Sequence, residues 1–123
     1  MWTYEQATGK LTGYTNGLNY APAVGYAGRD EGKNNPDMQN VKGIGPLPKG
    51  LYTILPPRPS PVVGPYALPL LPDPHNEMFN RSSFYIHGDS VEHPGEASHG
   101  CIVIDFSVRH LVWLSNDHVL EVV

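Results

Sequence analysis

Glycine and proline interrupt this chain so often that long regular elements have little room. The 123 residues include 13 glycines and 13 prolines, spread along the whole sequence. Glycine loses much backbone freedom in a helix, and proline lacks the N–H that a helix interior needs. A helical bundle or a coiled coil is therefore excluded, and short strands joined by many turns are expected. The length suits one domain whose core needs neither a metal nor a disulfide to fold.

Short β-prone runs stand between these turn signals. Alternating large and polar residues predict a hairpin over 2–15, with a connection near 7–10. The expected strands are 50–55, 66–71, 83–86, 102–104 and 119–123. The prolines within the second of these runs favour the edge of a sheet. The segment 16–46 reads as loop, which is long enough that it either hides short elements or forms part of a site.

One short helix is expected near residues 107–116. Ser107 can cap its start, and Val108, Leu111 and Val112 then fall on one face. Together these patterns predict a mostly β, single-domain sandwich or barrel that spans residues 1–123.

The charge pattern narrows the partners. Eight Lys and Arg are outnumbered by twelve Asp and Glu, for a net charge of −4, and the basic residues are scattered. Neither a nucleic-acid site nor a polybasic membrane anchor is expected. Pro65 and Pro69 break the most apolar stretch, so no membrane insertion is expected. The first residues lack the basic start and apolar core of a signal peptide, so we expect a soluble chain exported by another route.

Cys101 is the only cysteine, so its thiol is either a small buried hydrophobe or a reactive group. It follows Gly100 directly, and glycine lets a substrate approach the backbone closely. The N–H groups of these two residues are candidate donors to an oxyanion. His87 ends a predicted strand, and a loop can bring it to the cysteine. A Cys–His pair is the smallest unit that activates a thiol, and such activation would lower the thiol pKa.

Other interpretations stay open at this point. An inert core cysteine is common in small domains. His99 lies two residues before Cys101 and rivals His87 as the base, because side chains two apart share a face of an extended segment. Zinc binding by Cys101, His99, His93 and His87 is a weaker alternative, since the spacing matches no compact zinc motif.

The motif residues resemble a known family. His87-Gly88 followed by Ser98-His99-Gly100-Cys101-Ile102 resembles the signature of YkuD-like L,D-transpeptidases, and residues 45–54 resemble a strand of that family. A closer resemblance is to the short branch of peptidoglycan-targeting effectors delivered by type VI secretion. Its supporting features, in chain order, are Trp2-Thr3-Tyr4 with Gln6, Thr8-Gly9 with Leu11, then 25–28, 34–36, Arg81-Ser82 before Phe84, and 100–104.

The resemblance implies a β-rich enzyme that acts on peptidoglycan stem peptides without a metal or organic cofactor. Cys101 would attack the carbonyl of the third stem residue and release the terminal D-Ala, with His87 as base and the Gly88 carbonyl orienting its ring. Ser98 and His99 would shape the site, and Gly100 and Cys101 would form the oxyanion hole. Water, a D-amino acid or a second stem would accept the acyl group. We would then expect a monomer that acts in the target-cell periplasm and has a cognate immunity protein.

One position departs from the family pattern. Many members carry Arg or Asn where Val103 stands, so Arg81 or Arg29 is considered as a replacement that binds a substrate carboxylate. Tyr26 is a candidate for the wall of a substrate groove. The alternatives in function are a housekeeping or phage-encoded 3–3 cross-linking transpeptidase, a wall-binding module without catalysis, and a zinc hydrolase.

Overall fold

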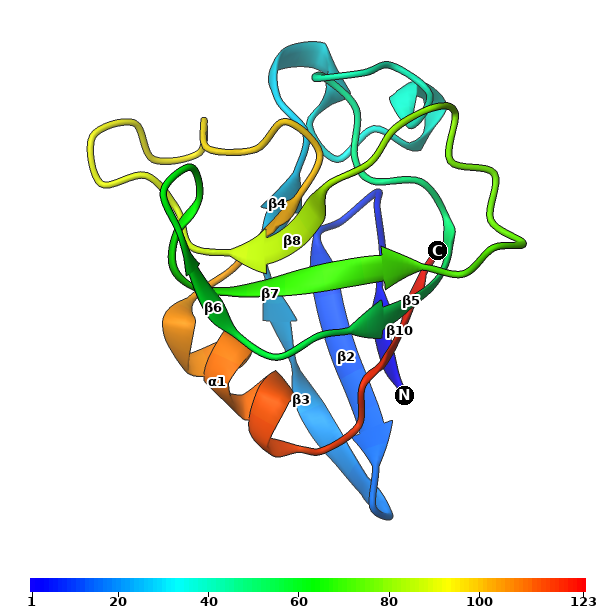
Figure 1. Cartoon of the computed structure of the whole chain (residues 1–123), viewed down its shortest axis with the longest axis vertical. Coiled ribbons are helices and arrows are strands. Elements are labelled where there is room, and N and C mark those ends of the chain that lie inside the picture. Colours follow the sequence, from blue (N-terminus) through cyan, green and yellow to red (C-terminus); the bar gives the residue numbers. More distant parts are fainter.

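Strands dominate the computed structural model, which describes residues 1–123 (Figure 1). In chain order they are β1 (Trp2–Tyr4), β2 (Lys10–Thr15), β3 (Leu18–Val24), β4 (Tyr26–Ala27), β5 (Gly50–Ile54), β6 (Arg58–Ser60), β7 (Gly64–Pro72), β8 (Phe84–His87), β9 (Ile102–Val103) and β10 (Val119–Val122). Two 3-10 turns, η1 (Asp30–Gly32) and η2 (Pro36–Met38), follow β4, and the single α-helix, α1 (Phe106–Leu114), precedes β10. No helix has the length and apolar character needed to cross a membrane.

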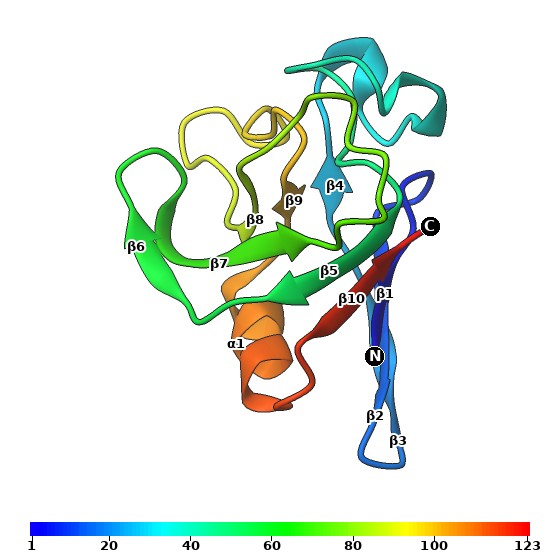
Figure 2. The same ribbon diagram turned by 45° about the vertical axis from the view of Figure 1, so that its right-hand side comes forward.

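The strands form one strongly curved sheet in the order β3-β2-β1-β10-β5-β7-β8-β9-β4, and β6 pairs with β7 outside this path. The two ends of the order are consecutive in the chain, because only Gly25 separates β3 from β4. A single segment therefore supplies both edges, and the sheet is a nearly closed barrel. Figure 2 shows the β2–β3 hairpin extending beyond this barrel, with α1 packed at its lower side.

The core lies inside the barrel and contains 16 buried residues, among them Tyr4, Tyr52, Leu68, Ile86 and Leu120. Most of them come from strands, some of which alternate buried and exposed positions as β5 does. The first and last strands run parallel, with Trp2 opposite Leu120. The core therefore depends on residues from both ends of the chain.

Most of the predicted architecture is confirmed. The structure is mostly β with one short helix, and the hairpin at the start and the strands at β5, β8, β9 and β10 lie where the patterns place them. The loop-like segment 16–46 hides the seven-residue strand β3 as well as β4.

Two predictions about elements are wrong. The proline-rich strand β7 lies between β5 and β8, not at an edge. Pro69 lies where the pairing of β7 with β5 ends, and its carbonyl still accepts from Leu55 N–H (2.9 Å). The N–H that proline lacks therefore removes only one hydrogen bond, at the end of the ladder. The helix begins one residue before Ser107, and Asp105 occupies the N-cap position without a side-chain capping bond.

Leu120 and Leu51 offer a matched test of this core, since they lie on paired strands and differ in burial. Leu120 is fully buried, whereas Leu51 is 42% exposed. We expect Leu120→Ala to lower the free energy of unfolding by about 2–4 kcal/mol, because the cavity it leaves cannot collapse. The Leu51→Ala control should cost less than about 1 kcal/mol. Urea unfolding measures both, and equal losses would contradict the assignment of the core.

Candidate active site

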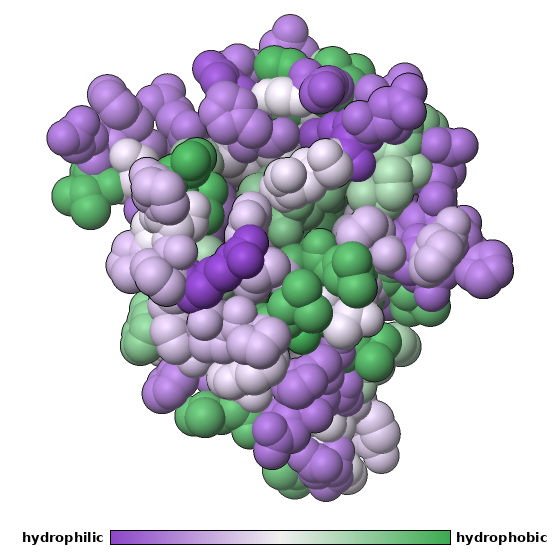
Figure 3. All heavy atoms as spheres, in the orientation of Figure 1, coloured by the Kyte–Doolittle hydropathy of each residue, from purple (hydrophilic) through white to green (hydrophobic).

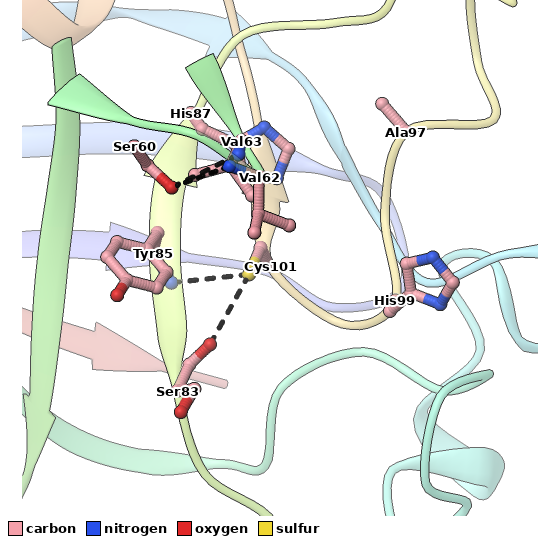
Figure 4. A pocket seen from close by; sticks show the side chains of 9 residues that line it. All are labelled: Ser60, Val62, Val63, Ser83, Tyr85, His87, Ala97, His99 and Cys101. Atoms are coloured by element: carbon pink, nitrogen blue, oxygen red, sulfur yellow. Dashed lines mark hydrogen bonds between the residues drawn. The ribbon is translucent and has the colours of Figure 1, made fainter. Parts of the chain in front are cut away.

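The register between β8 and β9 places the two expected catalytic side chains on one face. The strands are parallel, with Ile86 opposite Ile102 and His87 opposite Val103. Continuing this register by one residue sets Cys101 opposite Tyr85. Because alternate residues of a strand share a face, Tyr85, His87 and Cys101 all project to the same side. Cys101 and His87 line one pocket of about 380 Å³, and Figure 4 shows both side chains there.

The His87 ring is held in one orientation. Its Nδ1 lies 2.7 Å from the Gly88 carbonyl oxygen, which can only accept, so Nδ1 carries the proton and Nε2 is left as the acceptor. Only 2% of the surface of His87 is exposed. This burial lowers the pKa of His87 below its ordinary value, and the positive charge of Arg109 lowers it further, while the Gly88 bond opposes the shift. His87 is therefore a neutral imidazole at pH 7 and is suited to take a proton.

The Cys101 sulfur bonds to the backbone of the segment before and at the start of β8. It accepts from Tyr85 N–H at 3.3 Å, and the thiol points to the Ser83 carbonyl at 3.8 Å (Figure 4). Burial raises the pKa of the Cys101 thiol, and the Tyr85 N–H and the Arg81 charge offset only part of that rise. The lowered thiol pKa expected from the sequence is thus not what the structure gives. The resting pair is a neutral thiol beside a neutral imidazole.

Ser98 organises the turn that carries the cysteine. It is fully buried. Its hydroxyl donates to the Cys101 carbonyl at 2.6 Å and accepts from the N–H groups of Gly28 (2.8 Å) and Gly100 (3.0 Å). The Gly100 N–H is therefore already bonded and does not serve as the expected oxyanion donor in this arrangement. The Cys101 N–H, which lies beside its own sulfur, is left for that role.

Arg81, which the sequence suggested as a substrate ligand, ties four backbone carbonyls together in the structure. It is 95% buried. Its guanidinium donates to four backbone carbonyls, those of Gln39 (2.5 Å), Pro46 (2.8 Å), Gly45 (2.9 Å) and His99 (3.2 Å). With these donors engaged, the guanidinium has little left to offer a carboxylate. Arg29, the other arginine considered, instead faces Asp30 at the surface, 3.4 Å away.

Gly100 is required by the closeness of Arg81. Its φ is +137°, and a Cβ there would lie 2.6 Å from Arg81 Nη2 and 2.8 Å from the Phe84 ring. The absence of a side chain at Gly100 thus lets the guanidinium reach the turn just before Cys101.

Tyr26 also acts inside the protein and does not line the pocket. Its hydroxyl donates to Asp89 Oδ1 at 2.6 Å and accepts from Ala97 N–H at 2.9 Å. Burial and the Asp89 bond raise the pKa of Tyr26 to about 12. Tyr26 therefore fastens both ends of the loop between His87 and Ser98, and its hydroxyl is already bonded within the protein.

His99 stands at the rim of the pocket. Its side chain is exposed, and in Figure 4 its ring points away from the Cys101 sulfur. The structure thus favours His87 over its rival as the group that faces the thiol.

The pocket wall includes a hairpin tip that the sequence analysis did not single out. Val62 and Val63, between β6 and β7, line the pocket together with Ala97 from the opposite loop. Val62 is 88% exposed, and Figure 3 shows apolar surface over this hairpin tip next to largely hydrophilic loops. The proline and glycine signals of this segment predict a turn, but not that the turn reaches the cysteine.

A family model described as the Tlde1 domain matches residues 22–123, which is most of the chain. The chain belongs to the Tlde1 domain family. This is a family of type VI secretion effectors. A search of curated proteins finds no match. The matched part of this Tlde1 domain begins within β3, so β1 and β2 lie outside it although Trp2, Tyr4 and Leu11 belong to the buried core.

Arg109 is the functional candidate that sequence reasoning missed in this Tlde1 domain. It lies on α1 and is 95% buried, close enough to His87 to affect its charge state. A lone arginine in a helix pattern reads as a solvated charge, so no sequence signal identifies it. No group of three or more His, Cys, Asp or Glu side chains is gathered as a metal site would need, and the four side chains considered as zinc ligands are not clustered.

The role of Arg81 as a tie can be tested by stability. Arg81→Met leaves buried carbonyls without donors, so we expect the free energy of unfolding of this Tlde1 domain to fall by about 2–4 kcal/mol. Arg29→Met removes the same charge from the surface and should change it by less than about 0.5 kcal/mol. Unfolding in urea measures both. An Arg81→Met protein of unchanged stability would show that the carbonyl bonds are dispensable.

The charge state of Cys101 predicts how its alkylation depends on pH. The thiolate is the reactive form, so the rate with iodoacetamide should rise with a midpoint above the value of about 8.5 for a free cysteine. The same chain unfolded in urea is the control, since it carries the same single thiol. A native midpoint below that of the unfolded chain would instead indicate a resting thiolate.

Proposed function

We propose that this Tlde1 domain is a cysteine-dependent acyltransferase of peptidoglycan stem peptides, with L,D-carboxypeptidase and D-amino-acid exchange activity. The observation that carries the proposal is the pairing of Cys101 with His87 in one pocket, with the His87 tautomer set by the Gly88 carbonyl. The motif that these residues form resembles that of YkuD-like L,D-transpeptidases. Membership of a type VI effector family supports a cell-wall substrate.

The acylation step follows from the two neutral groups. His87 Nε2 takes the thiol proton as Cys101 Sγ attacks the carbonyl carbon of the third stem residue. The Cys101 N–H donates to the oxyanion that forms. The tetrahedral species then breaks the C–N bond to D-Ala, and His87 returns the proton to the leaving amine. A thioester on Cys101 and free D-Ala are the products.

In the second step an acceptor attacks the thioester and frees Cys101, and His87 again carries the proton. His87 takes a proton from water or from the amine of a D-amino acid as that acceptor attacks the thioester carbonyl. The C–S bond breaks, and the thiol of Cys101 regains the proton. Water gives a tripeptide stem, and a D-amino acid gives an exchanged tetrapeptide.

This chemistry accounts for the expected biology of an effector. Cleaved or exchanged stems lack the terminal D-Ala of the normal tetrapeptide, so the wall of the recipient cell is altered from the periplasm. A producer of such an enzyme needs protection, which a cognate immunity protein that covers the pocket would provide. The site therefore fits an antibacterial effector that acts after delivery.

Mass spectrometry of purified tetrapeptide muropeptides tests the proposal. Wild-type protein, with and without added D-Met, should convert them to tripeptides or to D-Met tetrapeptides, and Cys101→Ala should leave them unchanged. His87→Ala should lose turnover by at least about 10²-fold, the usual contribution of a general base.

His99→Ala is the matched control, because it removes an imidazole from the rim of the same pocket. It should keep most of the turnover. A stronger loss in His99→Ala than in His87→Ala would move the base to His99. Unchanged muropeptides with folded wild-type protein would favour a wall-binding module.

A further inference from the structure

Arg109 joins the helix α1 to two parts of the sheet next to the site. From α1, its Nε donates to the Tyr66 carbonyl on β7 at 3.1 Å, and its Nη1 donates to the Ile104 carbonyl just after β9. Ile104 in turn donates its N–H to the His87 carbonyl at 3.0 Å. Ile104 thus links the guanidinium of Arg109 to the backbone of His87, because it hydrogen-bonds to both.

The same guanidinium lies directly against Gly88. A Cβ on Gly88 would stand 3.1 Å from Arg109 Nη1 and 3.3 Å from Nη2, which is tighter than ordinary packing. Gly88 is the residue whose carbonyl holds His87 Nδ1. Any shift of the guanidinium therefore reaches the group that sets the tautomer of His87.

The charge of Arg109 is buried and takes part in none of the salt bridges of the structure. Burial lowers the pKa of its guanidinium, and the Asp105 carboxylate at the start of α1 is near enough to oppose that lowering.

Three other ionisable side chains line the same pocket as His87, namely Cys101, Tyr85 and His99 at its rim. Asp89 lies in the following loop, and His93 and Glu96 line a second pocket that His87 also lines. The Asp89 carboxylate keeps its charge and accepts a hydrogen bond from the Tyr26 hydroxyl. Arg109 is thus a fixed positive charge that packs against Gly88, the neighbour of His87, and it disfavours a second positive charge on the His87 ring.

We propose that Arg109 is a positioning residue for His87, which holds Gly88 against Nδ1 and keeps the imidazole neutral so that it can accept the thiol proton. The inference rests on the proposed function for its catalytic meaning. Its physical content, the effect of Arg109 on the His87 ring, is measurable without a substrate.

Two variants separate charge from contact. Arg109→Met removes the charge and keeps much of the apolar stem, so the titration midpoint of His87 should rise by about 0.5–1 pH unit. Arg109→Lys keeps the charge but loses the planar fork, so the midpoint should stay within about 0.3 unit while turnover falls about tenfold. Arg29→Met is the control for loss of a surface arginine and should change neither quantity.

The readouts are the NMR titration of the His87 ring, assigned by its loss in His87→Gln, and the acidic limb of the muropeptide pH profile. A higher midpoint moves that limb to higher pH, because protonated His87 cannot act as base. If Arg109→Met lowers stability or turnover but leaves the midpoint in place, the proposal is overturned. If Arg109→Met does not fold, Arg109→Lys decides: a tenfold loss at the wild-type midpoint supports the proposal, and wild-type turnover overturns it.

The design also separates this inference from the proposed function. Wild-type protein that leaves muropeptides unchanged would refute the proposed function. A shifted His87 midpoint in Arg109→Met would still establish the effect of Arg109 on the ring, and an unshifted one would refute that effect alone.

Discussion

The parallel pairing of β8 with β9 brings the end of one strand beside the beginning of the next, and the site depends on it. Because the ladder starts at Ile102, the Tyr85 N–H has no carbonyl opposite it and donates to the Cys101 sulfur instead. Two residues later on β8, the His87 carbonyl accepts from the Ile104 N–H. Thiol and imidazole are therefore placed by backbone hydrogen bonds and not by a direct contact between them.

Two buried arginines hold the loops that complete this arrangement, and neither forms a salt bridge. Arg81 donates hydrogen bonds to carbonyls of the segment before β5 and of the turn at Gly100. Arg109 donates to carbonyls on β7 and just after β9. A guanidinium suits this task because its donors diverge in a plane and reach several chain segments at once. Loops that lack regular hydrogen bonds thus gain fixed positions around a reactive side chain.

Sequence patterns predicted the class of fold, most strands and the Cys–His pair, because alternation, turn residues and strand ends are local features. They failed where an outcome depends on distant segments. Whether Arg81 or Tyr26 meets a substrate depends on which backbone carbonyls and carboxylates surround it, and those come from residues up to 63 positions away. The edge position predicted for β7 failed for the same reason, since the loss caused by Pro69 depends on where β5 ends. The raised thiol pKa reflects burial, which no motif encodes.

The pairing of the first strand with the last has a consequence for how the chain acquires its structure. β1 lies between β2 and β10 in the sheet. At the end of this pairing, Val123 N–H donates to the Tyr4 carbonyl, and the Val123 carbonyl accepts from Gln6 N–H. Pairing the first strand with the last closes a loop of nearly the whole chain. This costs conformational entropy before the contacts between the strands form, and such topologies fold slowly. During synthesis the edges of β1 and β5 stay unpaired until β10 leaves the ribosome. The barrel that supports the thiol therefore assembles only after β10 has been translated and has left the ribosome.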